Sequence, residues 1–219
     1  SSLLARFVVA PALLGEPELL NKIASAVRAV VPVDMPFTAK MRLGIDDTSL
    51  AVDCAQALAA GGIDELIVHG RTKLDGYRPP ARWEWIDKVR ASINIPLIAN
   101  GEVWTVEDFV HCQQETGCAD IMLGRGALAD PLLARRVRGE PAGGWENIRP
   151  ALASYWIGVR GKVRAEQAGG RINQWLALLR RHYPEAEALY QRLRPVAAAA
   201  DIDRLLVAAG ILQTVPLAA

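Results

Sequence analysis

The sequence is poor in the residues from which metal centres and disulfide scaffolds are built. Its 219 residues include only three cysteines and three histidines. Cys54, Cys112 and Cys118 show neither metal-ligand spacing nor the even number that a disulfide framework needs, so we expect structural thiols in a reducing, cytoplasmic setting. Only His111 lies next to a cysteine, and the sequence therefore predicts no bound metal.

The chain also lacks an excess of one charge and a long apolar run. Lysine and arginine number 25 against 24 aspartates and glutamates, a formal net charge of +1 that indicates no particular partner. Since no run of about 18 apolar residues is present, the sequence predicts no membrane span. The apolar run 7–14 faintly resembles a signal peptide, but Gly15 to Glu18 breaks it without a cleavage pattern. The composition, 51% hydrophobic, is that of a globular protein with a core.

What the sequence does contain is a series of four short motifs, each at the end of a mostly apolar run. A stretch that can form a helix follows each motif, at the spacing of βα units in a (β/α) barrel. Functional groups of such barrels lie at the carboxyl ends of the strands. Four ends make half a barrel. The motifs are Lys40-Met41-Arg42-Leu43-Gly44, Val68-His69-Gly70-Arg71-Thr72, Ala99-Asn100-Gly101-Glu102-Val103-Trp104 and Leu123-Gly124-Arg125-Gly126.

Periodicity and end signals divide the first part of the chain into alternating strands and helices. The wholly apolar runs at 66–68, 97–99 and 121–123 are typical of strands buried on both faces of a parallel sheet. Thr105 is a good N-cap, with Asp108 three residues later. The predicted strands are 37–43, 65–69, 96–99 and 120–123, and the predicted helices are 19–30, 50–60, 83–93 and 105–116.

The composition changes at the glycine-rich segment 139–144, which reads as a linker. We expect an α/β domain over 1–140, the C-terminal half of a TIM (β/α)8 barrel, followed by a small all-helical domain over 145–219. Its predicted helices are 148–163, 172–182, 184–193 and 201–209. The basic residues of this helical domain are consistent with solvated helix faces. As a cluster, they also suit a partner with a phosphate backbone. They are Arg160, Lys162, Arg164, Arg171, Arg180, Arg181, Arg192 and Arg194.

The residue types at the strand ends suit an anionic ligand. Gly124-Arg125-Gly126 before a helix offers backbone N–H groups, a helix dipole and a guanidinium, which together suit a phosphate monoester. Lys40 can stabilise negative charge on a ring or an enolate. His69, on the neighbouring strand, can donate a hydrogen bond or a proton. The plain alternatives are a surface lysine and a histidine bonded only to the scaffold.

In combination these motifs resemble the flavin-dependent tRNA-dihydrouridine synthases. The resemblance runs from about residue 12 to near the C-terminus. The motifs closest to the family are Lys40-x-Arg42-x-Gly44, His69-Gly70-Arg71-Thr72 with Gly76-Tyr77, Asn100-Gly101-Glu102 and Gly124-Arg125-Gly126. Two segments are most similar to the C-type bacterial branch, which reduces uridine 16 in the D-loop of tRNA. They are Asn100-Gly101-Glu102-Val103-Trp104 and Arg171-Ile172-Asn173-Gln174-Trp175-Leu176.

The resemblance implies an FMN-binding barrel with a C-terminal helical domain that grips tRNA. In this family NADPH reduces the flavin, the flavin passes hydride to C6 of uracil, and a cysteine protonates C5. The residues implied to bind FMN are Lys40, His69, Asn100, Gly101, Glu102, Gly124 and Arg125. The residues implied to meet tRNA are Arg71, Tyr77, Arg171, Asn173, Gln174 and Arg194.

The chain departs from the family pattern in its first residues. No Cys-Pro-Ser-like loop, which carries the catalytic cysteine, and no Ala-Pro-Met-like flavin loop occurs. Residues 7–9 stand where the family has polar and glycine residues, and Asn173 stands where its C-type branch has lysine. We therefore expect the chain alone to be inactive and to self-associate through an open barrel edge. The alternatives are a non-catalytic RNA-binding remnant and another FMN- or phosphate-binding barrel.

Overall fold

A computed structural model describes residues 4–214, which form two compact units. The first unit ends at Gly124 and the second begins at Arg125. The sequence predicts a later boundary, at 139–144. The difference arises from α5 (Arg125–Ala129) and α6 (Leu133–Val137), because α5 packs against α8 (Ala165–Leu179) in the helical unit.

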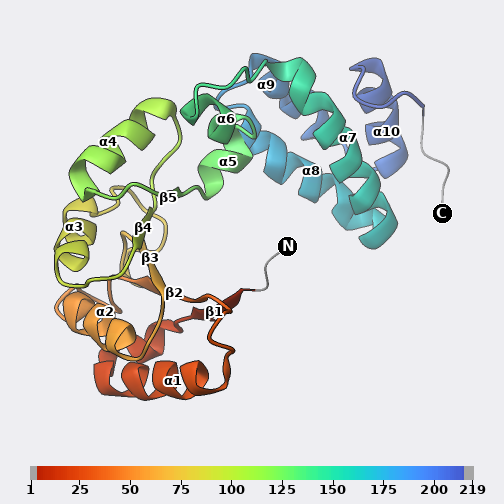
Figure 1. Cartoon of the computed structure of the whole chain (residues 1–219). Helices are drawn as coiled ribbons and strands as arrows, with labels where there is room; N and C mark the ends of the chain where they lie inside the picture. Colours follow the sequence, from red (N-terminus) through yellow and green to blue (C-terminus); the bar gives the residue numbers. More distant parts are fainter. Residues whose placement is uncertain (1–3, 215–219) are drawn as a thin grey trace. The chain divides into compact units, whose positions relative to one another are not determined.

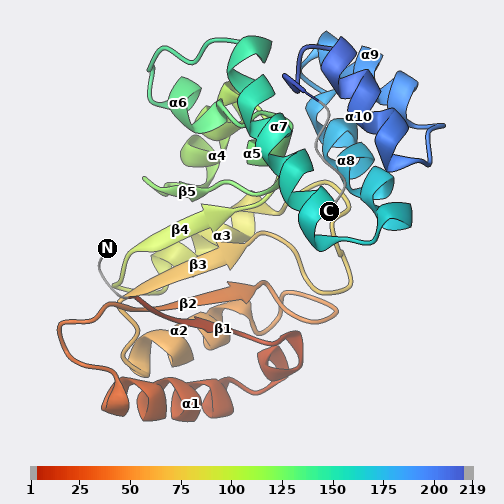
Figure 2. The ribbon, with the colours of Figure 1, turned by 90° about the vertical axis from the view of Figure 1, so that its right-hand side faces the viewer.

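The first unit is a run of parallel βα units. Its five strands pair in chain order, β1-β2-β3-β4-β5, and every pair is parallel (Figures 1 and 2). This arrangement confirms the predicted partial (β/α) barrel. The strands are β1 (Ala5–Val8), β2 (Phe37–Arg42), β3 (Glu65–His69), β4 (Leu97–Asn100) and β5 (Ile121–Met122). The helices between them are α1 (Pro17–Val30), α2 (Ala51–Ala60), α3 (Trp83–Ala91) and α4 (Val106–Thr116), and the 3-10 turn η1 (Pro11–Gly15) precedes α1.

The sheet begins earlier than the sequence predicts, because β1 precedes the first predicted strand, 37–43. β1 pairs with β2 in the register Ala5↔Phe37 to Val8↔Lys40. Its side chains alternate: Phe7 packs against the core under the helices, whereas Val8 is 65% exposed. A four-residue strand with an arginine in it and a proline three residues after it carries too short a pattern to be recognised locally.

The sheet has an apolar face toward the helices and a more polar opposite face. Along β2, Phe37, Ala39 and Met41 are buried in the core that the helices cover. Lys40 and Arg42 alternate with them and therefore point to the other face. In β3, Leu66, Ile67 and Val68 are fully buried, as the apolar run predicts. In β4 and β5 the corresponding runs are only partly buried, so burial on both faces is confirmed for β3 alone.

The start of α4 confirms the predicted cap. Thr105 Oγ1 accepts a hydrogen bond of 3.1 Å from the backbone N–H of Asp108, and the Asp108 carboxylate accepts one of 3.0 Å from the N–H of Thr105. This reciprocal pair satisfies two of the helix's unpaired N–H groups. It fixes the direction in which the chain leaves the motif at 99–104.

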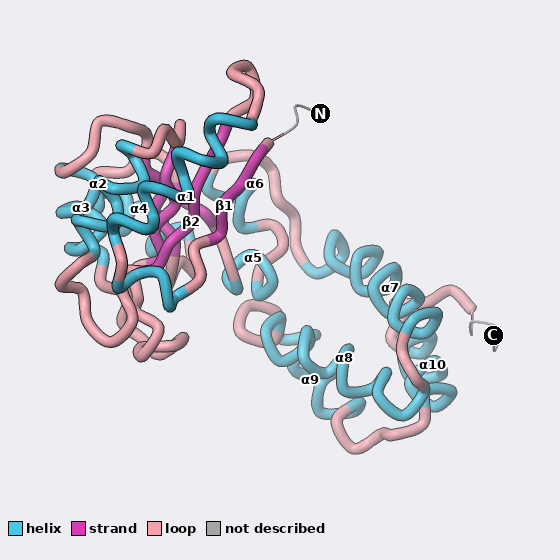
Figure 3. Tube along the Cα trace, turned by 90° about the horizontal axis from the view of Figure 1, so that it is seen from below, coloured by secondary structure: helices cyan, strands magenta, loops and turns pink. Residues whose placement is uncertain are grey.

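The second unit consists of helices in its described part, as predicted (Figure 3). The remaining helices are α7 (Trp145–Lys162), α9 (Pro184–Leu193) and α10 (Ala199–Ala208). Trp156 and Leu176 are fully buried in its core. Helix α8 begins at Ala165, seven residues before the predicted start, and includes Gly169. A Cβ on Gly169 would meet Ile202 of α10 at 3.0 Å, so glycine permits the close approach of these two helices.

Candidate active site

The carboxyl ends of β2, β3 and β4 bring together the predicted functional side chains of Lys40, His69 and Asn100, with Arg42 beside them. Arg42, His69 and Asn100 occupy one row of the sheet, because Arg42 pairs with His69 and His69 pairs with Asn100. Lys40 lies two residues earlier in β2, on the same face. Parallel pairing therefore places groups that are up to 60 residues apart in sequence at one edge of the sheet.

Lys40 and Asn100 contact each other directly. The Lys40 ammonium donates a hydrogen bond of 2.7 Å to Asn100 Oδ1, and Asn100 Nδ2 donates one of 2.7 Å to the carbonyl of Met122. Burial, followed by the positive charges of Arg42 and Arg6, lowers the pKa of Lys40 from 10.5 to about 8. A lysine that is charged but incompletely solvated is suited to stabilise negative charge on a ligand.

We expect Lys40→Met to remove a pH dependence of stability. The folded chain holds the Lys40 proton less tightly than the unfolded chain, so between about pH 8 and 10.5 the unfolded chain binds more protons and the free energy of unfolding rises with pH. Cys54 and Cys112, with pKa values raised by burial to about 11 and 12, act in the opposite sense. The difference between wild type and variant in urea denaturation, measured from pH 7 to 10, isolates Lys40.

Lys73→Met is the matched control, since Lys73 is exposed on the neighbouring loop. It is expected to leave the pH dependence as in the wild type. If the free energy of unfolding depended on pH in the same way in Lys40→Met and Lys73→Met, the lowered pKa assigned to Lys40 would be contradicted.

Arg71 is buried, although the resemblance implies a tRNA contact for it. Its side chain is 1% exposed, and its guanidinium reaches three segments. Nε donates to the carbonyl of Arg78 at 2.7 Å, Nη1 contacts His69 Nε2 at 3.3 Å, and Nη2 forms an ion pair with Glu102 Oε2. Arg71 therefore joins the end of β3 to the loop before α3 and to the loop after β4, and a tRNA contact by this residue stays a prediction.

The segment Gly101–Glu102 has a backbone conformation that few sequences accept. Gly101 has φ +121°, and a Cβ there would meet the His69 ring at 3.0 Å, so glycine is required. Glu102 has φ +63°. Two indole groups hold this turn: Trp83 Nε1 donates to the Gly101 carbonyl at 3.1 Å, and Trp104 Nε1 donates to Glu102 Oε1 at 2.9 Å. The sequence alone does not indicate these two donors, because nothing in the local pattern shows where an indole N–H finds its acceptor.

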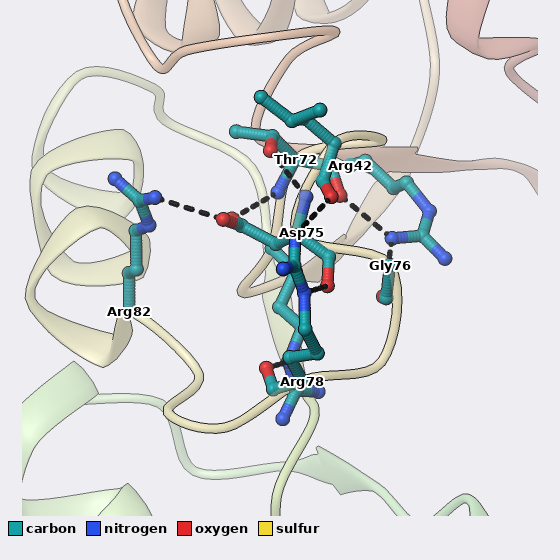
Figure 4. A network of polar contacts seen from close by, with 8 residues as sticks. Arg42, Thr72, Asp75, Gly76, Arg78 and Arg82 are labelled. Atoms are coloured by element: carbon teal, nitrogen blue, oxygen red, sulfur yellow. Dashed lines mark hydrogen bonds and ion pairs between the residues drawn. The ribbon is translucent and has the colours of Figure 1, made fainter.

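The loop after β3 is held by its own polar network (Figure 4). Thr72 and Asp75 bond each other's backbone N–H groups, and Arg82 forms an ion pair of 2.9 Å with Asp75. Arg42 donates to the carbonyls of Thr72 and Gly76 at 2.8 and 3.0 Å. The network presents Tyr77, which is 64% exposed and lies 5.3 Å below the Arg42 guanidinium. Tyr77 is therefore accessible to a large partner.

The predicted phosphate-binding pair falls at the unit boundary. Gly124 ends the first unit and is exposed, and a Cβ there would meet Asn100 Nδ2 at 4.0 Å. Arg125 is exposed and opens α5, which has only five residues. Their role toward phosphate stays a prediction.

The predicted tRNA contacts of the helical unit have different exposures. Arg171 and Gln174 are exposed on α8, and Arg194 is exposed directly after α9. Asn173 is half-buried, and its Oδ1 has no hydrogen-bond partner within residues 4–214. Nearby, Tyr155 donates to the Arg171 carbonyl at 3.2 Å, which fixes that turn of α8.

The three cysteines lie apart from the polar edge of the sheet. Cys54, Cys112 and Cys118 are buried in the core on the helix-covered side. Burial raises the pKa of each thiol. Among the described residues no group of three or more potential metal ligands gathers, and none of the described helices is long and apolar enough to cross a membrane.

The sequence matches a known protein family over most of its length. The profile of the dihydrouridine synthases matches residues 9–194. The chain belongs to the dihydrouridine synthase family. The tRNA-dihydrouridine(16) synthase of Pseudomonas syringae pv. tomato is 47% identical to it over 204 residues, and that of Cupriavidus necator is 46% identical over 199. The corresponding protein of Neisseria meningitidis serogroup B is 40% identical over 201 residues.

The shared region covers most of this chain but less of its relatives. It takes up 90% of this chain and 63% of the Pseudomonas syringae synthase, 89% and 62% for Cupriavidus necator, and 89% and 60% for Neisseria meningitidis. The chain thus spans less than two thirds of the length of these dihydrouridine synthases.

Proposed function

We propose that this chain forms part of an FMN-dependent enzyme that reduces uridine to 5,6-dihydrouridine in the D-loop of tRNA, at position 16, with NADPH as reductant. The observation that carries the proposal is the joint placement of Lys40, His69 and Asn100 at one edge of a parallel sheet in a dihydrouridine synthase. The tRNA-dihydrouridine(16) synthases at 40–47% identity support the substrate and the position.

The described residues fit a flavin. Lys40 is a partly desolvated cation, Asn100 is oriented by Met122, and Gly101 leaves room for the His69 ring, which a Cβ at that position would meet at 3.0 Å. When bound, FMN would supply the hydride for reduction of the uracil ring. We propose that Lys40, His69, Asn100, Gly101 and Glu102 hold its ring and ribityl chain. Gly124 and Arg125 would hold its phosphate.

We further propose that tRNA meets the loop around Tyr77 and the helical unit. Tyr77, Arg171, Gln174 and Arg194 are exposed, as a contact with a nucleic acid requires. Arginine guanidinium groups suit the phosphate backbone because they form paired, charge-assisted hydrogen bonds. Asn173 offers a carbonyl oxygen that lacks a donor in the described chain.

The chain by itself is proposed to be inactive. Uridine reduction requires a proton donor within hydrogen-bond reach of the base. Cys54, Cys112 and Cys118 are buried among the apolar residues on the other side of the sheet, and their pKa values are raised. None of the three can reach a base at the polar edge without disrupting the core. Incubation of the purified chain with FMN, NADPH and unmodified tRNA should yield no dihydrouridine.

A chimera tests the activity of the whole enzyme. In it, residues 9–219 of this chain replace the matching region of the Pseudomonas syringae synthase, in cells that lack their own enzyme for this position. Mass spectrometry of digested tRNA should find dihydrouridine at position 16, and Lys40→Met in the chimera should abolish it. A folded, FMN-loaded chimera that leaves position 16 unmodified would refute the proposal. Binding of tRNA without FMN would favour the RNA-binding remnant, and preference for a sugar phosphate would favour another phosphate-binding barrel.

A further inference from the structure

The buried guanidinium of Arg71 has a geometric relation to His69 that restricts the chemistry of the imidazole. Arg71 Nη1 lies 3.3 Å from His69 Nε2. An arginine side chain has only donors, so Nε2 must accept in this contact. A neutral imidazole has one accepting nitrogen, and its proton must therefore be on the other one.

We propose that Arg71 is a positioning residue that holds His69 as the neutral Nδ1–H tautomer. The guanidinium cannot turn away, because its other nitrogens are engaged. Nε donates to the Arg78 carbonyl at 2.7 Å, and Nη2 is paired with Glu102. The planar guanidinium of arginine can donate hydrogen bonds in three fixed directions at once, whereas a lysine ammonium on a flexible stem does not fix its donors in this way.

Glu102 is in turn held in place by Trp104. The indole Nε1 of Trp104 donates to Glu102 Oε1 at 2.9 Å, while Oε2 of the same carboxylate faces Arg71. A chain of polar contacts thus runs from Trp104 through Glu102 and Arg71 to His69. The carboxylate also compensates the charge of a guanidinium that is 1% exposed, which a buried cation requires.

Gly101 fixes which way the Nδ1–H group points. A Cβ on Gly101 would lie 3.0 Å from His69 Cδ2 and 3.4 Å from Nε2, so this edge of the ring rests against the turn. Nδ1 is the ring atom opposite the Cδ2–Nε2 bond, and it is therefore directed away from Gly101. In this tautomer the Nδ1–H group of His69 is a neutral hydrogen-bond donor rather than a positive charge, a group that suits a carbonyl oxygen or a ring nitrogen as acceptor.

The histidine content of the chain makes this tautomer directly measurable. The sequence has three histidines, and His111 and His182 are exposed. Nitrogen-15 NMR of the imidazole rings in the 219-residue chain distinguishes a protonated from an unprotonated ring nitrogen, and His69→Gln assigns the signal. We expect Nδ1 of His69 to be protonated and Nε2 unprotonated at pH 7. A His69 protonated at Nε2 in the unmutated chain would overturn the inference.

Paired variants separate positioning from simple structural support. Arg71→Met combined with Glu102→Gln removes the donor without leaving a buried carboxylate unpaired, and should release His69 into a mixture that includes the Nε2–H form. Trp104→Phe removes one contact of the network but keeps Arg71, and should preserve the tautomer. The nitrogen-15 signals of the two exposed histidines, His111 and His182, should be the same in the wild type and in every variant. If the double variant folded and retained a pure Nδ1–H signal, Arg71 would not be the positioning residue.

Only the use of this donor toward a ligand rests on the proposed function. A His69 held as Nδ1–H in a chain whose chimera fails to modify tRNA would leave the inference standing and refute the function. An active chimera together with a His69 protonated at Nε2 would support the proposed function and refute the inference about the tautomer.

Discussion

Replacing Gly44 with alanine is expected to lower the free energy of unfolding of the first unit by about 3 kcal/mol or more. A Cβ at this position would lie 1.9 Å from the backbone oxygen of Asp47, and φ is +155°, a region that side chains rarely adopt. The obstacle is main chain, which cannot swing aside as a side chain does. The Gly44 carbonyl also accepts a hydrogen bond of 2.9 Å from the Lys73 N–H. A distorted turn at Gly44 would therefore also disturb the loop after β3.

Gly158→Ala is the control for this substitution. Gly158 lies exposed within α7, and a Cβ there would meet nothing within 4 Å. Alanine should stabilise that helix by about 0.5–1 kcal/mol, because it restricts the unfolded chain. Urea denaturation with hydrogen exchange read by mass spectrometry assigns each change to its unit. A Gly44→Ala chain within about 1 kcal/mol of the wild type would contradict the geometry described for this turn.

Asp203→Ala is expected to destabilise the helical unit by about 3–5 kcal/mol. Asp203 is 1% exposed in α10, accepts a hydrogen bond of 2.7 Å from Trp156 Nε1 and faces Arg160 at 3.3 Å. Removing the carboxylate leaves an indole N–H without its acceptor and a mostly buried guanidinium without its counter-charge. Both groups then bear a desolvation cost that the carboxylate no longer offsets.

The matched control lies two residues away on the same helix. The side chain of Asp201 is 48% exposed and pairs with Arg204, so Asp201→Ala should change stability by no more than about 0.5 kcal/mol. Hydrogen exchange should locate the loss from Asp203→Ala in α7, α8 and α10 and leave β2–β4 protected. Equal effects of the two substitutions would show that the buried carboxylate is not a structural anchor.

The predictable part of the site follows from the direction of parallel strands. Lys40, His69 and Asn100 each close an apolar run, and runs that pair in parallel must end at the same edge, so local sequence was enough to bring them together. The cap of α4 was predictable for the same reason, since Thr105 and Asp108 are neighbours in sequence.

The features of the site that the sequence does not predict depend on contacts that local sequence patterns do not reveal. A buried Arg71 needs the compensating charge of Glu102, 31 residues later, and no local pattern announces that pairing. Trp104 and Trp83 appear apolar in a sequence, yet their N–H groups hold the turn at Gly101–Glu102. β1 was missed because its four residues derive their register from β2 rather than from their own alternation.

The alternation along β2 makes its length less tolerant of change than its composition. Phe37, Ala39 and Met41 belong to the core, while Lys40 and Arg42 belong to the polar edge. A substitution affects one of these two sets. Deletion of a single residue before residue 40 would exchange them, placing the cations under the helices and the apolar side chains where a ligand is expected. Sequence changes that this strand tolerates should therefore be substitutions, with insertions and deletions confined to the turns at either end.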